Sequence, residues 1–471
     1  MIGFIRRLLK DRRGNALAIA CAAMPLIIGC AGLATDTIEW TLWKRQLQRA
    51  ADSAALAGVY DRASATNGAT TNTPTAVCND LAVNLHTWMN LIGTSLCTGT
   101  VGSYSDIQYP AADAFVGNKV QVTLRVQQRL PFSSLFMSAA PTIQAVATAG
   151  AVSYGGTPCM LALNTAGQAI DNSGNATVSA PTCILYSDSA AANSAAAGGT
   201  SAITAKAIAG VGGIASSNNW NVQSYMPYSP SLPDPFAPPS TTAVTPNPSD
   251  MKCAGHYESQ GGGQNVVTTW VYDDLTYSTD MANATWLDTS GASPVVRTGG
   301  ANCWKSLTVG SNRSLTVPAN FGPLYVNGGN VQLQGAFTCN GCAIVLTNKD
   351  TSATATIGTW SSNAQATNNI TAPTSGTYNG IAVYQDRRAT GGTDQINGGS
   401  GNVISGVVYF PNDTLWLNGT GDAVSLCSMF VAKNLKFNGG GRISISSAAD
   451  AACFGLGLPN TQSVTIVRLI A

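Results

Sequence analysis

The residue types that most often perform catalysis are sparse in this chain. Its 471 residues contain only two histidines, His86 and His256. Catalytic triads and most zinc sites place an imidazole beside other named groups, so this scarcity leaves little room for either. We expect His86 to be a packing or surface residue and His256 to lie in a loop. We predict no cofactor and no metal site.

The best acidic grouping for chemistry is Asp386, which precedes Arg387 and Arg388, with Asp394 nearby. Glycoside hydrolysis needs two carboxylates that face one sugar. Successive residues of a strand point to opposite faces, and the spacing does not place a second carboxylate beside Asp386. A surface ion pair at a corner of the fold is therefore the favoured interpretation. A carbohydrate-active enzyme is the alternative.

A further candidate is the pair of cysteines at Cys339 and Cys342, which Asn340 and Gly341 separate. A redox pair of this spacing needs a thioredoxin-like setting with a helix N-terminus, and a zinc site needs a second cysteine pair or histidines. Asn-Gly between two strand-like runs is typical of a tight turn. We therefore expect a structural disulfide, with the redox and zinc interpretations as alternatives.

The overall composition favours a scaffold over an enzyme. Only 10% of residues are charged, against roughly 25% in ordinary globular chains. Lys and Arg number 24 and Asp and Glu 23. This balance argues against a nucleic-acid-binding protein, because neutralising phosphates needs a basic excess. The 45% of hydrophobic residues can form a large core. A polar but uncharged surface is expected for a structural or extracytoplasmic protein.

An uncharged apolar run covers residues 16–34 and follows a basic segment at 6–13. As a helix the run is roughly 28 Å long, close to the thickness of a bilayer's hydrocarbon core. A basic flank before the span predicts a cytoplasmic N-terminus and an external remainder. A cleaved signal peptide ending near Ala34 and a buried core helix are the alternatives.

Residues 36–58 predict a helix that continues out of the membrane, which favours a retained anchor. Small and apolar side chains recur there at three- and four-residue steps, and Gly58 suits a helix C-cap. Asp36 marks the exit from the span, and Trp40 and Trp43 are expected to be interfacial anchors. A surface for partner membrane proteins is expected at Gly29, Gly32, Leu47, Ala50 and Ala54.

Ten cysteines lie beyond the predicted span, and an even number fits an oxidising compartment such as the periplasm. Cys21 and Cys30 lie within the apolar run and are expected to be buried thiols. Sequence cannot fix disulfide connectivity, so pairing of nearest neighbours is a hypothesis. It joins Cys78 to Cys97, Cys159 to Cys183, Cys253 to Cys303, Cys339 to Cys342 and Cys427 to Cys453.

A small α+β unit is predicted between the membrane helix and the rest of the chain. A polar linker over 61–75 is followed by helical spacing over 76–91. Strict alternation over 119–126 and 142–152 predicts two half-buried strands. We assign residues 1–60 to the basic tail, transmembrane helix and juxtamembrane helix, and residues 61–157 to an α+β stalk in the periplasm.

From residue 158 onward the pattern predicts mainly β structure. Asn-Gly turns at Asn397, Asn418 and Asn438 are 21 and 20 residues apart. A short repeat of strands and tight turns suits one coil of a solenoid. The predicted fold is a right-handed parallel β-helix (β-solenoid), and a β-sandwich is the alternative. Four apolar runs are expected to form successive rungs: 343–346, 381–384, 407–410 and 429–432.

We place the β-helix at residues 158–455, with a long insertion at 221–318. The insertion includes a Pro-rich excursion over 227–248. Because proline lacks a backbone N–H, this excursion cannot form a regular helix or a central strand. Residues 456–471 are expected to form a C-terminal strand or tail.

The N-terminal stretch resembles the Flp pilus-assembly TadE/TadG-like domain of bacteria. The matching features are DRRGNA over 11–16 before the apolar span, Asp36 after it, and LQRAADSAALAG over 47–58. More loosely, the sequence from residue 378 to 445 resembles the β-helical regions of TadG-like proteins. The resemblance implies a single-pass component of the bacterial inner membrane that serves a tight-adherence (Flp) pilus. It also implies a cytoplasmic N-terminus, a periplasmic bulk, and other pilus-assembly membrane proteins as partners.

Two properties of the family are not matched. Prepilin-type processing would need a Glu five residues after Gly14, where Ile19 stands. Some TadG-like proteins carry a von Willebrand A domain with an Asp-x-Ser-x-Ser metal site, but the nearest segment here, Asp171 to Asn175, ends in Asn. We therefore expect a non-enzymatic, membrane-anchored component that scaffolds or anchors the pilus machinery. A metal-dependent adhesion module is a further alternative.

Overall fold

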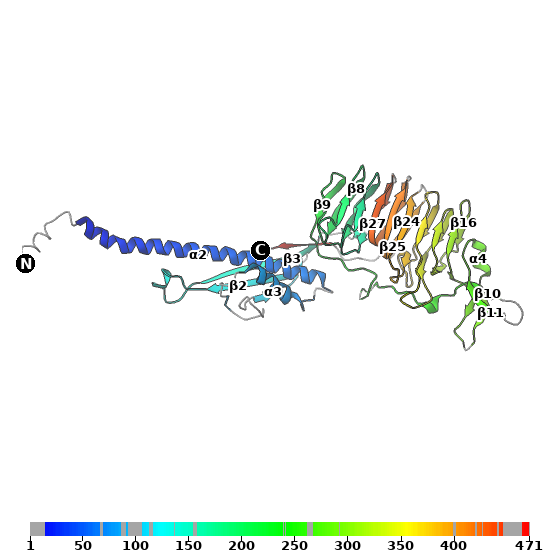
Figure 1. Ribbon diagram of the computed structural model, residues 1–471, viewed down its shortest axis with the longest axis horizontal. Coiled ribbons are helices and arrows are strands. Elements are labelled where there is room, and N and C mark those ends of the chain that lie inside the picture. The colour runs from blue at the N-terminus through cyan, green and yellow to red at the C-terminus, as the bar shows by residue number, and fades with distance from the viewer. Residues whose placement is uncertain are drawn as a thin grey trace, which may run out of the picture. The chain divides into compact units, whose positions relative to one another are not determined.

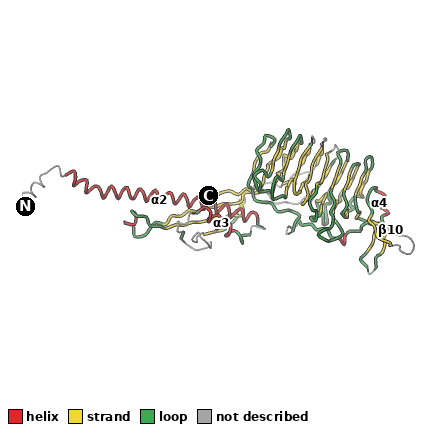
Figure 2. Tube along the Cα trace, in the orientation of Figure 1, coloured by secondary structure: helices red, strands yellow, loops and turns green. Residues whose placement is uncertain are grey.

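The computed structural model divides the chain into two compact units, which are described separately. Unit 1 comprises residues 1–153 and 466–471, and unit 2 comprises residues 154–465. Figures 1 and 2 show a long helix beside a small sheet in unit 1 and a stack of strands in unit 2. The structure describes residues 15–65, 69–85, 91–92, 106–112, 116–135, 137–153, 158–238, 240, 242–260, 267–291, 293–398, 402–419, 422–425, 427–439, 442–445 and 464–470.

One helix, α2 (Asn15–Ser64), covers both the apolar run and the segment that follows it. The predicted helix over 36–58 is confirmed as a direct continuation of the apolar helix. Within the described part of the chain, α2 is the one helix long and apolar enough to cross a membrane, judged by length and composition. It therefore links the apolar segment to the folded part of unit 1.

The helix predicted over 76–91 is shifted toward the N-terminus. Helix α3 runs over Thr73–Asn84, and Leu85 already has an extended backbone with φ −100° and ψ 136°. Pro74 fits the first turn of α3, where its missing N–H is not needed, and this explains the earlier start. Leu91 instead forms an antiparallel bridge with Val126. His86 lies outside the described residues.

Unit 1 packs α2 and α3 on a four-stranded sheet. The strand order is β1-β2-β3-β29, with antiparallel pairing of β1 with β2 and of β2 with β3. The two strands predicted from alternation are confirmed as β2 and β3. A short 3-10 turn, η2 (Ser133–Leu135), lies between them. The strands are β1 (Asp106–Gln108), β2 (Val116–Gln127), β3 (Thr142–Ser153) and β29 (Thr465–Leu469).

This arrangement differs from the predicted division of the N-terminal region. The sequence placed a boundary at residue 60 and a separate tail at 456–471. In the structure the whole of α2, the sheet and residues 466–471 belong to one unit. The reason is that the second half of α2 supplies one side of the hydrophobic core that the sheet closes.

Unit 2 is dominated by a sheet of 21 strands, and its described pairings are parallel. The strand run begins with β14 pairing with β17, β15 with β18 and β16 with β19. From β14 to β22 each strand pairs with the third strand after it. Elsewhere the partner is closer in sequence, as for β23 with β25 and β4 with β6. Parallel pairing of these strands excludes the two antiparallel layers of the β-sandwich alternative. The first strands are β4 (Pro158–Ala162), β5 (Ile170–Asn172), β6 (Thr177–Ser187), β7 (Ala195–Ala197), β8 (Ala202–Gly210) and β9 (Trp220–Met226).

The second group of strands completes this sheet after a long connection. It comprises β14 (Cys303–Trp304), β15 (Leu307–Val309), β16 (Ser314–Val317), β17 (Gly322–Asn327), β18 (Val331–Leu333), β19 (Ala336–Asn340), β20 (Cys342–Thr347), β21 (Trp360–Ser362), β22 (Thr367–Thr371), β23 (Ile381–Gln385), β24 (Thr393–Gly398), β25 (Val403–Gly419), β26 (Asp422–Ser425), β27 (Ser428–Asn438) and β28 (Arg442–Ile445).

The register of these strands matches the repeat found in the sequence. The four apolar runs lie on β20, β23, β25 and β27, which pair in that order. Asn397 lies opposite Asn418, and Asn418 lies opposite Asn438. The three Asn-Gly pairs therefore align across neighbouring strands, as their even spacing predicts, but their asparagines lie at the C-terminal ends of β24, β25 and β27 rather than in turns.

The chain does not run through the sheet from one end to the other. Strand β27 pairs with β4, and β28 pairs with β6, so the last strands lie beside the first. Strands β9 and β14 lie at the two ends of the strand order, and residues 227–302 connect them. Because β9 and β14–β16 belong to the sheet, the predicted insertion at 221–318 was too wide.

The connection carries small elements of its own. Two antiparallel pairs stand outside the large sheet, together with a short helix. These elements are β10 (Gly255–Gln260), β11 (Val267–Tyr272), β12 (Thr285–Asp288), β13 (Val295–Thr298), α4 (Ser278–Asn283) and the 3-10 turn η3 (Pro248–Asp250).

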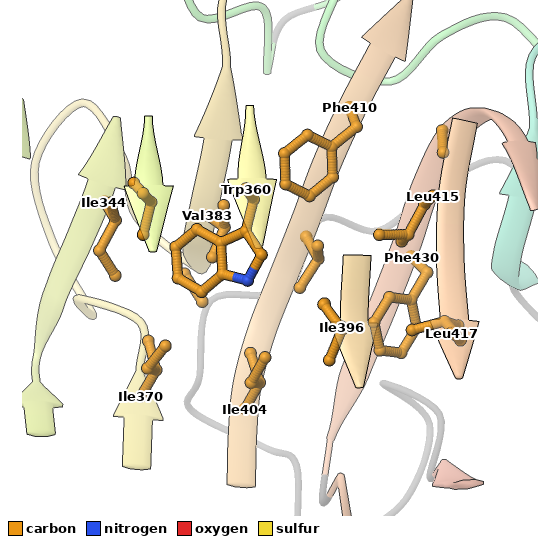
Figure 3. Close-up of a cluster of buried hydrophobic side chains, with 14 of the residues drawn as sticks. Ile344, Trp360, Ile370, Val383, Ile396, Ile404, Phe410, Leu415, Leu417 and Phe430 are labelled. Atoms are coloured by element: carbon orange, nitrogen blue, oxygen red, sulfur yellow. The ribbon is translucent and has the colours of Figure 1, made fainter. Parts of the chain in front are cut away.

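The core of unit 2 lies between the strands of the large sheet. Trp360, Phe410 and Phe430 are buried among aliphatic side chains such as Ile344 (Figure 3). These residues come from β20, β21, β25 and β27, of which β25 and β27 pair directly. Stacking of neighbours therefore buries what one short strand alone would leave exposed.

Candidate functional site

The first half of α2 presents large apolar side chains that no other described residue covers. Within the apolar run they are 48% to 71% exposed. Transferring one such side chain from water to an apolar medium gains about 1.5–3 kcal/mol. A row of them on one helix therefore favours a lipid environment. The residues are Ile19, Met24, Leu26, Ile27, Ile28 and Leu33.

The second half of α2 is buried by unit 1 itself. Leu47 and Ala54 have no exposed surface, and Ala50 is 1% exposed. They pack against inward-facing residues of β2 and β3, such as Val122 and Ala147. The hypothesis that Leu47, Ala50 and Ala54 contact partner membrane proteins is therefore wrong, because their small-residue stripe packs on the chain's own sheet.

The three glycines of α2 have different surroundings. A Cβ on Gly58 would lie 2.9 Å from Val120 Cγ1, so Gly58 permits close packing. It is not a C-cap, because the helix continues to Ser64. Gly32 lies directly against the ring of Phe132, while Gly29 has nothing within 4 Å. Of the predicted helix-packing residues, Gly29 is thus the one left open to another helix.

Asp36 and the tryptophans near the end of the apolar run are held by unit 1. Asp36 is 2% exposed and accepts a hydrogen bond from the backbone N–H of Ser133. Trp43 is 7% exposed and belongs to the hydrophobic core, and Trp40 packs against that core. The predicted interfacial-anchor role is therefore wrong for Trp43.

Three of the five predicted disulfides are present: Cys159–Cys183, Cys253–Cys303 and Cys339–Cys342. Cys78 and Cys427 are also disulfide-bonded, and Cys97 and Cys453 lie outside the described residues. Cys21 and Cys30 are free and exposed rather than buried. Cys339 and Cys342 lie on β19 and β20 rather than at a helix N-terminus, and both are 0% exposed, so the setting that a redox pair needs is missing. No further ligands for zinc lie beside them among the described residues.

The Pro-rich excursion covers a column of tyrosines on unit 2. Tyr384 lies opposite Tyr409 in the register of β23 and β25, and their rings stack with centroids 5.1 Å apart. The Tyr384 hydroxyl donates to the Val244 carbonyl at 2.7 Å, and the Tyr409 hydroxyl donates to Asp234 at 2.6 Å. Phe236 packs edge-on against Tyr409. We name residues 227–252 the strap.

The arginines that follow Asp386 have two different roles. Arg387 donates to the Val244 carbonyl of the strap at 3.0 Å and lies over the Tyr409 ring. Arg388 forms an ion pair with Asp386 at 2.8 Å. The predicted ion pair is present, but its carboxylate is only 6% exposed, so it is not a surface pair. Both arginines therefore act in packing.

The sequence did not predict that Asp394 and Asp413 form a buried pair of carboxyl groups. Asp394 is 0% and Asp413 2% exposed, and Gln385 Nε2 donates to Asp413 Oδ2 at 2.8 Å. Burial, with a smaller contribution from the neighbouring Asp413, raises the pKa of Asp394 to about 8. The Trp360 backbone N–H opposes this by donating to Asp394 at 2.6 Å. Both carboxyl groups are enclosed, so this pair is inaccessible to a polysaccharide.

The remaining candidate groups lie on separate elements. His256 is on β10 rather than in a loop, and its Nδ1 lies 2.6 Å from Asp273 Oδ1. This contact raises the pKa of His256. Asp171 is on β5, with its carboxylate 3.6 Å from Lys436 Nζ. Among the residues that the structure describes, no group of three His, Cys, Asp or Glu could hold a metal ion.

Comparisons with known proteins find a family match that covers α2. Residues 14–65 match a family model described as "Putative Flp pilus-assembly TadE/G-like". No curated protein matches the chain. A search of solved structures gives the competence-associated pilin ComZ from Thermus thermophilus at 10% identity and a TM-score of 0.22. That alignment covers 81% of this chain and 86% of the pilin, and so low a score does not indicate a shared fold.

The family match covers the helix from its exposed apolar half to its end at Ser64. It includes Asp36, Leu47, Ala50, Ala54 and Gly58, through which α2 packs inside unit 1. The chain carries a TadE/G-like Flp pilus-assembly domain at residues 14–65.

Proposed function

We propose that this protein is a non-enzymatic, membrane-anchored component of Flp/Tad pilus assembly. The single observation that carries the proposal is the coincidence of the TadE/G-like match at 14–65 with a helix whose first half is apolar and exposed. In this proposal α2 crosses the bacterial inner membrane once. The N-terminus is cytoplasmic because basic residues precede the span.

The rest of the chain would lie in the periplasm. The disulfides of unit 2 support this location, because such bonds persist in oxidising compartments. Unit 2 would be a right-handed parallel β-helix. Parallel pairing of strands that are two or three positions apart in the chain, such as β14 with β17 and β25 with β27, supports that architecture. Such a stack would scaffold or anchor the pilus machinery through a stable, weakly charged surface.

The membrane part of the proposal is tested by placing charge in the exposed half of α2. A lysine at the centre of a span costs about 2.5–3.5 kcal/mol in membrane insertion. We expect Leu26→Lys combined with Ile27→Lys to release the protein from carbonate-washed membranes. The matched control is Val83→Lys on α3, where the side chain is 84% exposed but lies outside the apolar run. Equal retention of the double variant and the control would contradict a membrane anchor.

The assembly part is tested by affinity capture of the full chain from detergent-solubilised membranes. We expect other pilus-assembly membrane proteins to co-purify. Gly29→Leu should reduce this capture without reducing membrane retention, because Gly29 is open to a neighbouring helix and small residues permit close helix contact. The same set of co-purifying proteins from an unrelated single-pass protein would contradict the assembly role.

A further inference from the structure

The connection between β2 and β3 is unusually apolar for the end of a hairpin. The described part of this connection is residues 128–135 and 137–141, and it includes Arg129, which donates to the Ser138 carbonyl at 2.7 Å. Residues 130–135 and 137 are here called the hairpin tip. Leu130, Pro131 and Phe132 begin it, and no acidic residue occurs between Arg125 and the start of β3. Met137 is 41% exposed, and Pro131 is also exposed. Exposed hairpin connections are usually polar, so this composition needs a physical reason.

The hairpin tip lies against α2 at the end of the apolar run. Turn η2 contacts α2, the Phe132 ring packs on Gly32, and the Ser133 backbone N–H donates to Asp36. Along the helix axis, Gly32 is about 3 Å from Ala34, which is the last residue of the uncharged run. The tip therefore sits at the depth where the predicted span ends.

The rest of the hairpin runs along α2 away from that level (Figure 1). Lys44 donates to the Gln144 carbonyl, and Gln48 Nε2 donates to the Val146 carbonyl at 2.9 Å. Gln48 lies about 21 Å beyond Ala34 along a helix. Only the tip of the hairpin thus reaches the end of the apolar run.

The contacts at the hairpin tip also bury the charge of Asp36, which would otherwise disfavour a lipid environment. Asp36 is the first charge after the span, and it is 2% exposed with its carboxylate bonded to the Ser133 N–H. Leu33, on the same level of α2, is 48% exposed. With the acid covered, Leu33 on α2 and Pro131 and Met137 on the hairpin tip are exposed apolar residues near the end of the apolar run.

We infer that the hairpin tip is a second membrane contact: Pro131, Phe132 and Met137 lie in the outer interfacial layer of the bilayer that α2 crosses. The occupant of this surface is the lipid of that same bilayer. The inference rests on the proposed membrane anchor. Insertion of a few apolar side chains at this level would fix the direction in which unit 1 leaves the membrane, because one helix alone can tilt and rotate.

The test compares three positions of one environment-sensitive fluorophore on the full chain. The protein is placed in nanodiscs of phosphatidylethanolamine and phosphatidylglycerol under non-reducing conditions. One sample carries the label on native Cys30, with Cys21→Ser. The other two carry it at Met137→Cys or at Val146→Cys, each with Cys21→Ser and Cys30→Ser. Val146 is the matched control, because it is 36% exposed on the same hairpin, at the level of Gln48.

Quenching by aqueous iodide and by spin-labelled lipid is then measured for each sample. We expect the label at position 137 to be quenched several-fold less by iodide than the label at 146, and several-fold more by lipid. Equal iodide quenching at 137 and 146, with Cys30 still protected, would overturn the hairpin contact and leave the anchor intact. Iodide quenching of Cys30 itself would overturn both the anchor and the contact.

Discussion

Unit 1 and unit 2 protect their apolar side chains in different ways. Unit 1 places α2 on one face of an antiparallel sheet and leaves the first half of the helix uncovered. Unit 2 buries its core between parallel strands, covers an outer tyrosine column with the strap and adds disulfides. Its described exposed large hydrophobic residues are confined to 225–296, in β9 and the connection after it. Most exposed large apolar side chains of unit 1 lie on α2, which is consistent with a membrane anchor, whereas those of unit 2 lie outside its stacked core.

The largest expected effects on stability come from substitutions in the core of unit 1 and in the core of unit 2. Phe337 in unit 2 and Leu47 in unit 1 both have no exposed surface. We expect Phe337→Ala to cost about 3–5 kcal/mol and Leu47→Ala about 2–5 kcal/mol in free energy of unfolding, through lost burial and the cavity left behind. Calorimetry of the detergent-solubilised chain should show each variant lowering a different transition. Val83→Ala, at an exposed position, is the control. Both variants shifting one common transition equally would contradict two separate cores.

The second comparison lies within unit 2 and concerns its disulfides. Cys253–Cys303 closes a sequence separation of 50 residues, and Cys339–Cys342 a separation of 3. Constraint of the unfolded chain predicts a stabilisation of about 4 kcal/mol for the first and about 2 kcal/mol for the second. We expect the double serine variant of the first pair to lose more stability in urea unfolding. Equal losses would show that loop closure is not the main contribution of these bonds.

A third effect concerns the buried acid of unit 2 and depends on pH. The pKa of Asp394 is about 8 in the folded chain and 3.8 as a free group. In the folded chain Asp394 keeps its proton over a pH range in which the unfolded chain has lost it. The contribution of Asp394 to the free energy of unfolding is therefore fully present below about pH 3.8 and is lost as the pH rises toward about 8. The slope for one proton is about 1.4 kcal/mol per pH unit. Asp188, with a pKa raised by burial to about 7, adds to the fall in the same direction.

Asp394→Asn should therefore flatten the decline of stability between pH 5 and 8, as urea unfolding at a series of pH values would show. The amide can still accept from the Trp360 N–H and has no charge to bury. Asp288→Asn is the contrasting variant, since Ser290 and Arg297 lower the pKa of Asp288 to about 2. Its removal should lower stability at neutral pH instead. A steeper decline in Asp394→Asn would contradict the raised pKa.

The sequence was most informative where a local period matches a long element. Alternation over Val120, Val122, Leu124 and Val126 located β2, because every second residue must face α2. The even spacing of Asn-Gly turns indicated parallel stacking for the same kind of reason. Pairing of nearest cysteines succeeded at Cys159–Cys183 and Cys253–Cys303 because parallel pairing brings these segments together. It succeeded at Cys339–Cys342 because one tight turn joins β19 to β20.

The sequence was least informative where a feature depends on distant residues. A stripe of small residues on α2 permits close contact with a partner helix and with the chain's own sheet alike. The sequence therefore led to the wrong contact surface for Leu47, Ala50 and Ala54. Asp394 and Asp413 become neighbours only through the register that sets Asp394 opposite Leu415. That register follows from the alignment of Asn397 with Asn418, so the repeat itself contained the signal. The order of strands in the sheet, with β4 beside β27, had no such local signal.

The smallest effect tests how the strap covers the tyrosine column. Tyr409→Phe removes the donor to Asp234 but keeps the stacked ring on Tyr384. In this variant Asp234 still has Arg387 as an ion-pair partner, with the Arg387 Nε 3.6 Å from the Asp234 Oδ2. We therefore expect the free energy of unfolding to fall by about 1 kcal/mol, which is close to the net contribution of one hydrogen bond. Hydrogen exchange should quicken at strap amides such as Val244, which bonds to the Phe236 carbonyl at 3.1 Å. Amides of β25 and β27 should keep their protection, because the stack does not depend on this hydroxyl. Faster exchange throughout the stack would mean that the strap and the stacked strands unfold together, and that unit 2 has no separate outer layer.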